Sequence, residues 1–211
     1  MMLSMAAATL NMFQGDGSRP AQHDGLAELS DLLTRAANRD SRAWERLVHL
    51  YARRVYAAAR SRLGSPEAAE EITQSVMTTV FEQITGGRYR DDGRFESWLF
   101  RIAMNRVRDA ARARSRNARL AEDSRHTHGL RLADDPAPDP EKAGERSALR
   151  HALVNLPEAD QEVLSLRHHA ELSFQTIASL LDAPLGTVLA RHHRALAKLR
   201  AQLTEHAGDS P

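Results

Sequence analysis

The stretch WLFRIAMNRVRDAARARSRNAR, residues 98–119, decides the fold of this chain because one predicted helix there carries two different faces. Apolar residues recur at helical spacing along it, which predicts a face that packs inward. This inward face comprises Trp98, Leu99, Ile102, Ala103, Val107 and Ala110. A second set at steps of three and four residues forms a polar stripe, made of Arg101, Asn105, Arg108, Arg112, Arg116 and Arg119.

The polar stripe is strongly basic. The stretch holds seven arginines and one acid, Asp109, whereas the formal net charge of the whole 211-residue chain is only +1. Surface helices commonly balance their cations with Glu four residues away, and this stripe has no Glu. Guanidinium groups also suit bidentate contact with phosphate. We therefore expect the stripe to bind a nucleic-acid backbone, and the alternative is a solvated helix face.

Composition limits the remaining possibilities. The absence of cysteine excludes disulfides, thiolate zinc sites and cysteine nucleophiles, and it fits a reducing compartment, so we expect a cytoplasmic protein. Aromatic content is only 5%, and abundant Ala, Leu, Arg and Glu favour helices, so the expected fold class is all-α. Residues 1–23 lack a cationic segment and a long apolar run, which predicts a flexible leader and no membrane insertion.

Helical periodicity predicts an N-terminal domain over residues 24–119. One helix is indicated by Leu26, Leu29, Leu33 and Ala36, a second begins after Asp40 and ends near Leu63 and Gly64, and a third starts with Ser65 and Pro66 and reaches about Ile84. The loop TGGRYRDDGR, residues 85–94, connects it to the basic helix. Its Tyr89 is either a stacking platform for an unpaired base or a ring that closes the loop onto the core.

An acidic, proline-containing linker is expected over residues 120–144. This linker is either a solvated tether or a segment that lies on a protein partner away from DNA. A C-terminal domain follows over residues 145–205, and residues 206–211 form a tail. In this domain we expect helices from Leu149 and from Glu158, and a short helix capped by Ser173.

The last predicted helix follows a tight turn, Asp182-Ala183-Pro184, which makes a helix-turn-helix. Its inward face is predicted to comprise Leu185, Val188, His192, Leu196, Leu199 and Leu203. The same helix carries Arg191, Arg194, Lys198 and Arg200, and its first turn is where such a helix meets base edges and phosphates. A second basic helix beyond an acidic linker strengthens the interpretation of a DNA-binding protein.

Several motifs carry a family resemblance. The segments are EEITQSVMTTVF (residues 70–81), FESWLFRIAMNRVRD (95–109), LPEADQEVLSLR (156–167), LSFQTIASLL (172–181) and PLGTV (184–188). With them, the chain resembles a sigma-70 family RNA polymerase sigma factor of the extracytoplasmic-function (ECF) group over about residues 31–203. The resemblance implies two small helical domains, the region 2 bundle and the region 4 helix-turn-helix, joined by a flexible linker. The first segment resembles the helix that binds core polymerase, and the second resembles the segment that melts and recognises the −10 promoter element.

The resemblance also implies site residues. Core polymerase would be bound by Glu70, Glu71, Gln74 and Ser75. The −10 DNA would be bound by Arg88, Tyr89, Arg90, Trp98, Arg101, Asn105, Arg108, Asp109, Arg112 and Arg116. The −35 DNA would be bound by Ser173, Thr187, Arg191, His193, Arg194 and Lys198. The implied partners are core RNA polymerase, through its clamp and flap, promoter DNA and an anti-sigma factor, and no cofactor, metal or catalytic residue is implied.

The chain departs from the family pattern at several positions. Ser75 stands where Glu is common, and Ala68 stands where Asp is common. Glu171 and Asp182 occupy positions that are often Gly. Residues 189–190, Leu-Ala, follow Gly-Thr-Val where Lys-Ser is frequent, which removes a cation and a hydroxyl from the predicted DNA-recognition helix.

Two rival functions remain. A stand-alone helix-turn-helix regulator would bind promoter DNA without polymerase. An enzyme would use the two His-His doublets, at residues 168–169 and 192–193, together with Glu162 as a metal or acid–base cluster. Successive helical residues point about 100° apart, and no His-Glu-x-x-His spacing occurs, so neither doublet chelates as a unit.

Overall fold

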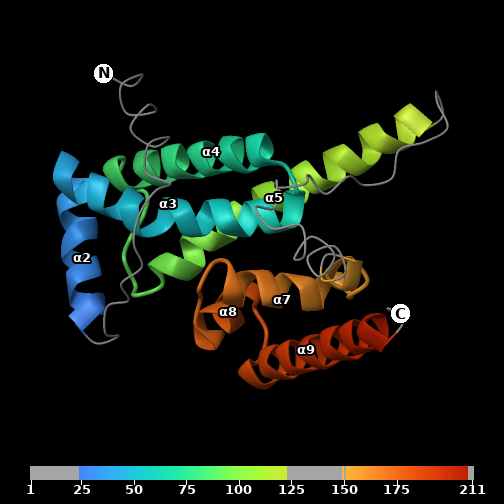
Figure 1. The fold of residues 1–211 in the computed structure, drawn as a ribbon. Coiled ribbons are helices and arrows are strands. Elements are labelled where there is room, and N and C mark those ends of the chain that lie inside the picture. Colours follow the sequence, from blue (N-terminus) through green and yellow to red (C-terminus); the bar gives the residue numbers. More distant parts are fainter. Residues whose placement is uncertain (1–23, 123–148, 150, 209–211) are drawn as a thin grey trace. The chain divides into compact units, whose positions relative to one another are not determined.

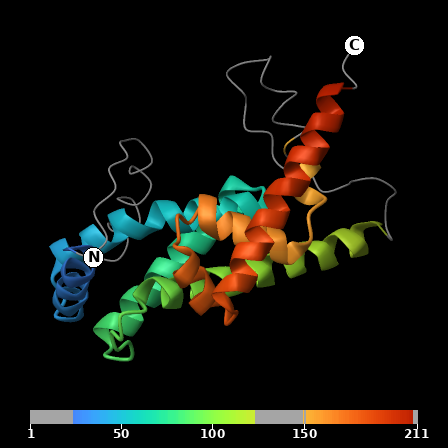
Figure 2. The ribbon, with the colours of Figure 1, turned by 90° about the horizontal axis from the view of Figure 1, so that it is seen from below.

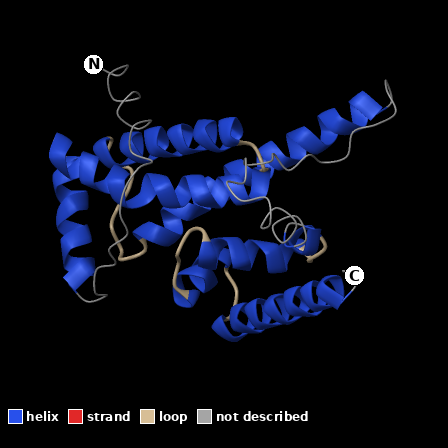
Figure 3. Ribbon diagram, in the orientation of Figure 1, coloured by secondary structure: helices blue, strands red, loops and turns tan. Residues whose placement is uncertain are grey.

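The computed structural model describes residues 24–122, 149 and 151–208 (Figure 1). Most of these residues are helical and none lies in a strand, which confirms the all-α prediction (Figure 3). The chain divides into two compact units, Met1–Asn117 and Ala118–Pro211. The predicted leader, residues 123–144 of the predicted linker and the end of the predicted tail lie outside the described residues.

The first unit is built from α2 (Asp24–Ala37), α3 (Ser41–Leu63), α4 (Pro66–Thr85) and α5 (Phe95–Glu122). Helix α3 begins at a side-chain cap, because the Asp40 carboxylate accepts hydrogen bonds from the backbone N–H groups of residues 42 and 43. It ends at Gly64, whose φ of 70° is in the left-handed region. Ser65 Oγ then accepts a hydrogen bond from Ala68 N at the start of α4. The predicted helix ends are confirmed.

The inner face of α5 forms much of the core of the first unit. Six of its side chains are at most 2% exposed: Phe95, Leu99, Phe100, Ala103, Met104 and Val107. The predicted inward set lacked Phe100 and Met104, and it included Trp98, which is only half-buried. Helix α5 also continues to Glu122, beyond the predicted boundary at residue 119, because residues 120–122 are good helix formers. Figures 1 and 2 both show it as one long helix.

An ion pair inside an aromatic cluster joins α3 to the first turn of α5. Arg54 Nη1 lies 2.7 Å from Glu96 Oε1, and both side chains are largely shielded from solvent. The Arg54 guanidinium also lies over the Tyr51 ring, 5.2 Å from its centroid. The Tyr51 ring in turn meets Phe95 edge to face, with the centroids 5.2 Å apart. These contacts fix where α5 begins relative to α3.

The second unit contains a helical segment at residues 151–154, α7 (Glu158–His168), α8 (Phe174–Leu181) and α9 (Leu185–Gly208). Its core includes Ala152, Leu156, Leu164, Ala195 and Leu199. Helices α8 and α9 form the predicted helix-turn-helix. The prediction that Leu185 faces inward is wrong, because its side chain is 40% exposed. Leu185 is the first residue of α9, about 60° around the helix from buried Val188, so it lies at the edge of the packed face.

Two residues of the second unit have an unusual backbone conformation. Glu171 has a φ of 55° and Asp182 has a φ of 50°, both in the left-handed region. Asp182 is the C-cap of α8, and its N–H donates to Ala178 O. A side chain with a Cβ is disfavoured in this region. This explains why glycine suits these two positions, at which the sequence departs from the family pattern.

A histidine pair joins α7 to α9. The Nε2 atoms of His168 and His192 lie 3.0 Å apart, so the N–H of one ring donates a hydrogen bond to the ring nitrogen of the other. The edge of the Phe174 ring closes the other side of His192, with the centroids 5.0 Å apart. Burial is the main cause that lowers the pKa of His192, and the nearby His168 ring and Arg167 guanidinium add to the effect. The pair therefore favours the neutral state of His192.

Glu171→Gly is expected to stabilise the second unit by about 1 kcal/mol, because it removes a left-handed non-glycine residue. Chemical denaturation of the full chain measures the change. The matched control is Ala197→Gly, an exposed position in the interior of α9, which should destabilise by about 1 kcal/mol because glycine weakens a helix interior. A loss of stability in Glu171→Gly would contradict the strain argument.

Acidification should destabilise the second unit as the pH falls through about 6.5, the usual pKa of histidine. A lowered pKa in the folded state means that the unfolded chain takes up the proton more readily, so lowering the pH favours unfolding. NMR titration of the His192 ring should give a pKa below the usual value, and thermal unfolding should lose part of its pH dependence in His192→Gln. A His192 pKa at or above 6.5 would show that the pair does not hold the neutral state.

Candidate nucleic-acid interface

The predicted polar stripe is displayed along the outer face of α5. Arg101, Asn105, Arg112 and Arg116 are exposed and Arg108 is half-exposed, while the side chain of Arg119 lies outside the described residues. Arg108 Nη1 donates a 2.8 Å hydrogen bond to Asn105 Oδ1, so two side chains of the stripe hold each other in position. At 1.5 Å per residue, the stripe from Arg101 to Arg116 extends over about 22 Å. A rigid row of cations of this length suits a nucleic-acid backbone.

Two other arginines of α5 contribute to the fold rather than to the stripe. Arg106 donates to Thr79 Oγ1 at 2.6 Å and also to Ser75 Oγ, which links α5 to α4. Arg114 Nη1 donates to the carbonyl of Leu63 at the end of α3. From the sequence, Arg106 and Arg114 were recognised only as part of the net positive charge of residues 98–119. The contacts between helices show that Arg106 and Arg114 also hold α5 in place.

The loop between α4 and α5 is anchored by its tyrosine. The Tyr89 ring packs on Trp98, with the centroids 4.4 Å apart, and meets the edge of Phe95. Its hydroxyl donates to Asp91 Oδ1 at 3.1 Å. Burial is the main cause that raises the Tyr89 pKa, and the neighbouring Asp91 carboxylate adds to it. Of the two roles open for Tyr89, the ring contacts favour packing onto the core, while Arg88 and Arg90 on either side are exposed.

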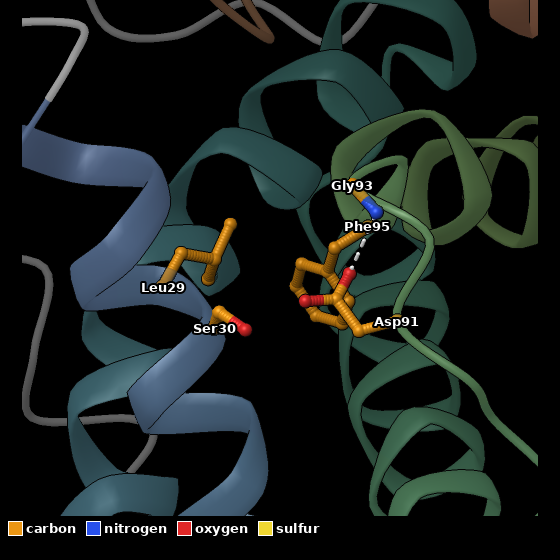
Figure 4. A pocket seen from close by; sticks show the side chains of 5 residues that line it. All are labelled: Leu29, Ser30, Asp91, Gly93 and Phe95. Carbon is orange, nitrogen blue, oxygen red and sulfur yellow. Dashed lines mark hydrogen bonds between the residues drawn. The ribbon is translucent and has the colours of Figure 1, made fainter.

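A pocket of about 310 Å³ lies between this loop and α2 (Figure 4). It is lined by Leu29, Ser30, Asp91, Gly93 and Phe95. The Asp91 carboxylate accepts a 3.1 Å hydrogen bond from the Gly93 N–H, where a φ of 77° suits glycine. An apolar surface beside a carboxylate can hold a flat group that carries an amine. The predicted site lacked Asp91 and the α2 residues, because only the tertiary structure brings α2 to the loop.

The predicted polymerase-binding residues form one turn of α4. Glu71, Gln74 and Ser75 are exposed and Glu70 is half-exposed. Ser75 Oγ accepts a hydrogen bond from Arg106, which links this surface to α5, the helix that carries the basic stripe. The four side chains thus form a second polar surface on the first unit, open to solvent. Asp109, the acid of the predicted −10 site, is exposed on α5.

The predicted −35 site lies mainly on α9. His193, Arg194 and Lys198 are exposed, while Thr187 and Arg191 are half-exposed. Lys198 Nζ lies 3.8 Å from the carboxylate of buried Asp160 on α7. Ser173 differs from the others because it caps α8, where its Oγ accepts a 3.0 Å hydrogen bond from Thr176 N. The α9 side chains form a basic surface on the helix that follows the turn.

The rival interpretation as a metal enzyme lacks a ligand cluster in the described part of the chain. The structure pairs one histidine from each doublet, His168 with His192, which the sequence did not predict. Within residues 24–122, 149 and 151–208, however, no three His, Cys, Asp or Glu side chains come together as a metal site. None of the described helices is long and apolar enough to cross a membrane.

Comparison with known protein families matches both units. The family model for Sigma-70 region 2 matches residues 47–117, and the model for Sigma-70, region 4 matches residues 152–201. The ECF RNA polymerase sigma factor SigE of Mycolicibacterium smegmatis is 33% identical over 172 residues, which span 80% of this chain and 64% of SigE. The ECF RNA polymerase sigma factor SigK of Mycolicibacterium vanbaalenii is 31% identical over 179 residues, which span 82% of this chain and 88% of SigK.

Solved structures share the fold. CnrH, determined in complex with the cytosolic domain of CnrY, has a TM-score of 0.60 at 24% identity and covers 85% of this chain and 97% of its own. The sigma factor RpoE of Bartonella quintana, determined with the anti-sigma factor NepR, has a TM-score of 0.58 at 21% identity and covers 76% of this chain and 96% of its own. Because the two region models match more than half of the chain and relatives such as SigK match over most of their length, the chain belongs to the sigma-70 family of RNA polymerase sigma factors, in its ECF group.

Proposed function

We propose that this chain binds core RNA polymerase and directs it to specific promoters, where it recognises and melts the −10 element and binds the −35 element. The observation that carries this proposal is the construction of α5, which buries one face and displays the basic stripe on another. The pocket beside Asp91 lies at the start of the same helix. In this proposal the chain acts by binding and has no catalytic residue of its own.

The stripe would hold phosphates while the loop before α5 captures a base. Backbone contacts set the register of a protein on DNA, and sequence is recognised by contacts to the bases. An unpaired base that leaves the stack is bound by a shaped pocket and by hydrogen bonds to its edge. The Asp91 carboxylate can accept such a bond from an exocyclic amine, and Leu29 on the α2 side of the pocket supplies an apolar group. This arrangement would stabilise the open form of a promoter.

The polymerase would be bound by the α4 surface of Glu70, Glu71, Gln74 and Ser75 through its clamp, and by the second unit through its flap. The −35 DNA would meet Thr187, Arg191, His193, Arg194 and Lys198 on α9, with Ser173 supporting the turn. An anti-sigma factor is a further proposed partner, because the similar RpoE was determined with one. Because the proposed partner is bacterial core RNA polymerase, the proposed location of the protein is the cytoplasm.

Run-off transcription from a promoter library tests the function directly. Purified core polymerase with the chain should produce transcripts that core polymerase alone does not produce. The DNA upstream of their start sites should share two spaced sequence elements. A stand-alone regulator would instead bind these promoters tightly without polymerase. The absence of specific transcripts, together with failure of the chain to co-elute with core polymerase, would overturn the proposed function.

Arg112→Ala should weaken promoter complexes of the holoenzyme by a similar factor for different promoter sequences, because Arg112 lies on the exposed stripe. The slope of log affinity against log salt concentration should become shallower by about 0.9, the value for one phosphate contact. Filter binding at several salt concentrations measures both effects. Arg114→Ala is the matched control, since Arg114 binds the Leu63 carbonyl and should leave the salt slope nearly unchanged. A loss confined to some promoter sequences would assign Arg112 to base recognition.

The double charge reversal Glu70→Lys with Glu71→Lys should reduce association with core polymerase by at least about tenfold, because a surface complementary to two carboxylates would repel two added cations. Co-elution and fluorescence anisotropy measure the association, and circular dichroism should show unchanged helicity. Glu28→Lys with Glu45→Lys makes the same charge change on α2 and α3 and serves as the control. Equal effects of the two double variants would mean that net charge, and not the α4 surface, governs the association.

A further inference from the structure

The first two turns of α9 present an apolar surface to solvent. Among the residues that the structure describes, the exposed large apolar side chains are Leu149, Val154, Leu185 and Leu189. Two of them, Leu185 at 40% and Leu189 at 43% exposure, stand four residues apart and are neighbours on the helix. Gly186 and Ala190 beside them are also exposed. These four residues carry no side chain that can form a hydrogen bond, whereas Thr187 and Arg191 on the same turns are half-exposed.

The packing of α9 keeps this apolar surface turned away from the core. Val188, between the two leucines in sequence, is completely buried, and Ala195 two turns later is buried on the same side. The backbone N–H groups of Thr187 and Val188 both donate to the carbonyl of Pro184, and these hydrogen bonds order the first turn of α9. Leu185 and Leu189 thus keep a fixed position at the leading end of α9.

Basic side chains follow the apolar surface directly along the helix. His193, Arg194 and Lys198 are exposed on the next two turns. Such a sequence of groups fits duplex DNA, in which phosphates border a groove of base edges. The N-terminal residues of the second helix of a helix-turn-helix are those that contact base edges in the major groove. Leu185 and Leu189 occupy these positions.

The major groove offers one apolar group to such leucines. Each base pair displays a pattern of donors and acceptors there, and thymine alone adds a C5 methyl group. We infer that Leu185 and Leu189 recognise thymine methyl groups in the −35 element, so that part of this element is selected by apolar contact. The inference rests on the proposed function, and it names the base chemistry that the α9 surface selects.

Deoxyuridine substitution in the promoter tests the inference without altering the protein. Replacing a thymine by deoxyuridine removes the methyl group and keeps every hydrogen-bonding group of the base. At the thymines that meet Leu185 or Leu189, the affinity of the holoenzyme for the promoter should fall about fourfold, the effect of about 0.8 kcal/mol for one methyl-sized group. Other thymines in the −35 element should show little change.

The variant Leu189→Ala should lose the discrimination between thymine and deoxyuridine at the thymines that meet Leu189 and retain it at those that meet Leu185. It should keep its helicity, because alanine is a strong helix former. Val154→Ala, which truncates an exposed apolar side chain outside α9, is the matched control and should keep the discrimination. Circular dichroism and association with core polymerase are measured for both variants.

Three results would overturn the inference. The first is specific initiation that no deoxyuridine substitution in the −35 element weakens, which leaves the proposed function standing. The second is weaker binding of core polymerase by Leu189→Ala with unchanged discrimination, which would assign the leucines to a protein contact. The third is the absence of specific initiation from unmodified promoters, which would remove the proposed function as well.

Discussion

Burial of the inner face of α5 is the interaction on which the proposed promoter-binding surface depends. Leu99, Phe100 and Met104 are almost fully buried, and each large apolar side chain in such a position contributes about 1.5–3 kcal/mol. Repulsion between like charges four residues apart on a helix is only about 0.2–0.5 kcal/mol per pair. The core therefore outweighs the mutual repulsion of the arginines, and the stripe is held in an arrangement that it could not maintain by itself.

The same helix brings the other parts of the candidate site into register. Glu96 in its first turn pairs with Arg54, and Phe95 and Trp98 hold the Tyr89 ring, which positions the loop that contains Asp91. Further along α5, Arg106 binds the hydroxyl groups of α4 beside the proposed polymerase surface. One rigid element thus connects the surface proposed for polymerase, the pocket proposed for a base and the stripe proposed for phosphates.

In the second unit, helix α9 likewise has one face buried in the core and another exposed to solvent. Val188 and Ala195 anchor α9 to the core, so its remaining surface is available to a ligand. Leucines occupy the leading end and basic side chains occupy the following turns. Membership of the sigma-70 family sets the general task of this unit, and Leu189 stands where the family pattern often has Lys. A surface of this kind makes the choice of bases depend on methyl groups as well as on hydrogen bonds.

The sequence by itself determined the helices, the family and the basic stripe, because helical periodicity, caps such as Asp40 and Ser65, and short motifs are local properties of the chain. It also predicted the histidine doublets as poor chelators, but it could not show that His168 meets His192 across two helices. Only the tertiary structure decided that Arg106 and Arg114 support the fold, that Leu185 is exposed, and that α2 forms a pocket with Asp91. Each of these outcomes depends on contacts between residues far apart in sequence, and helix periodicity does not specify which neighbour a side chain will meet.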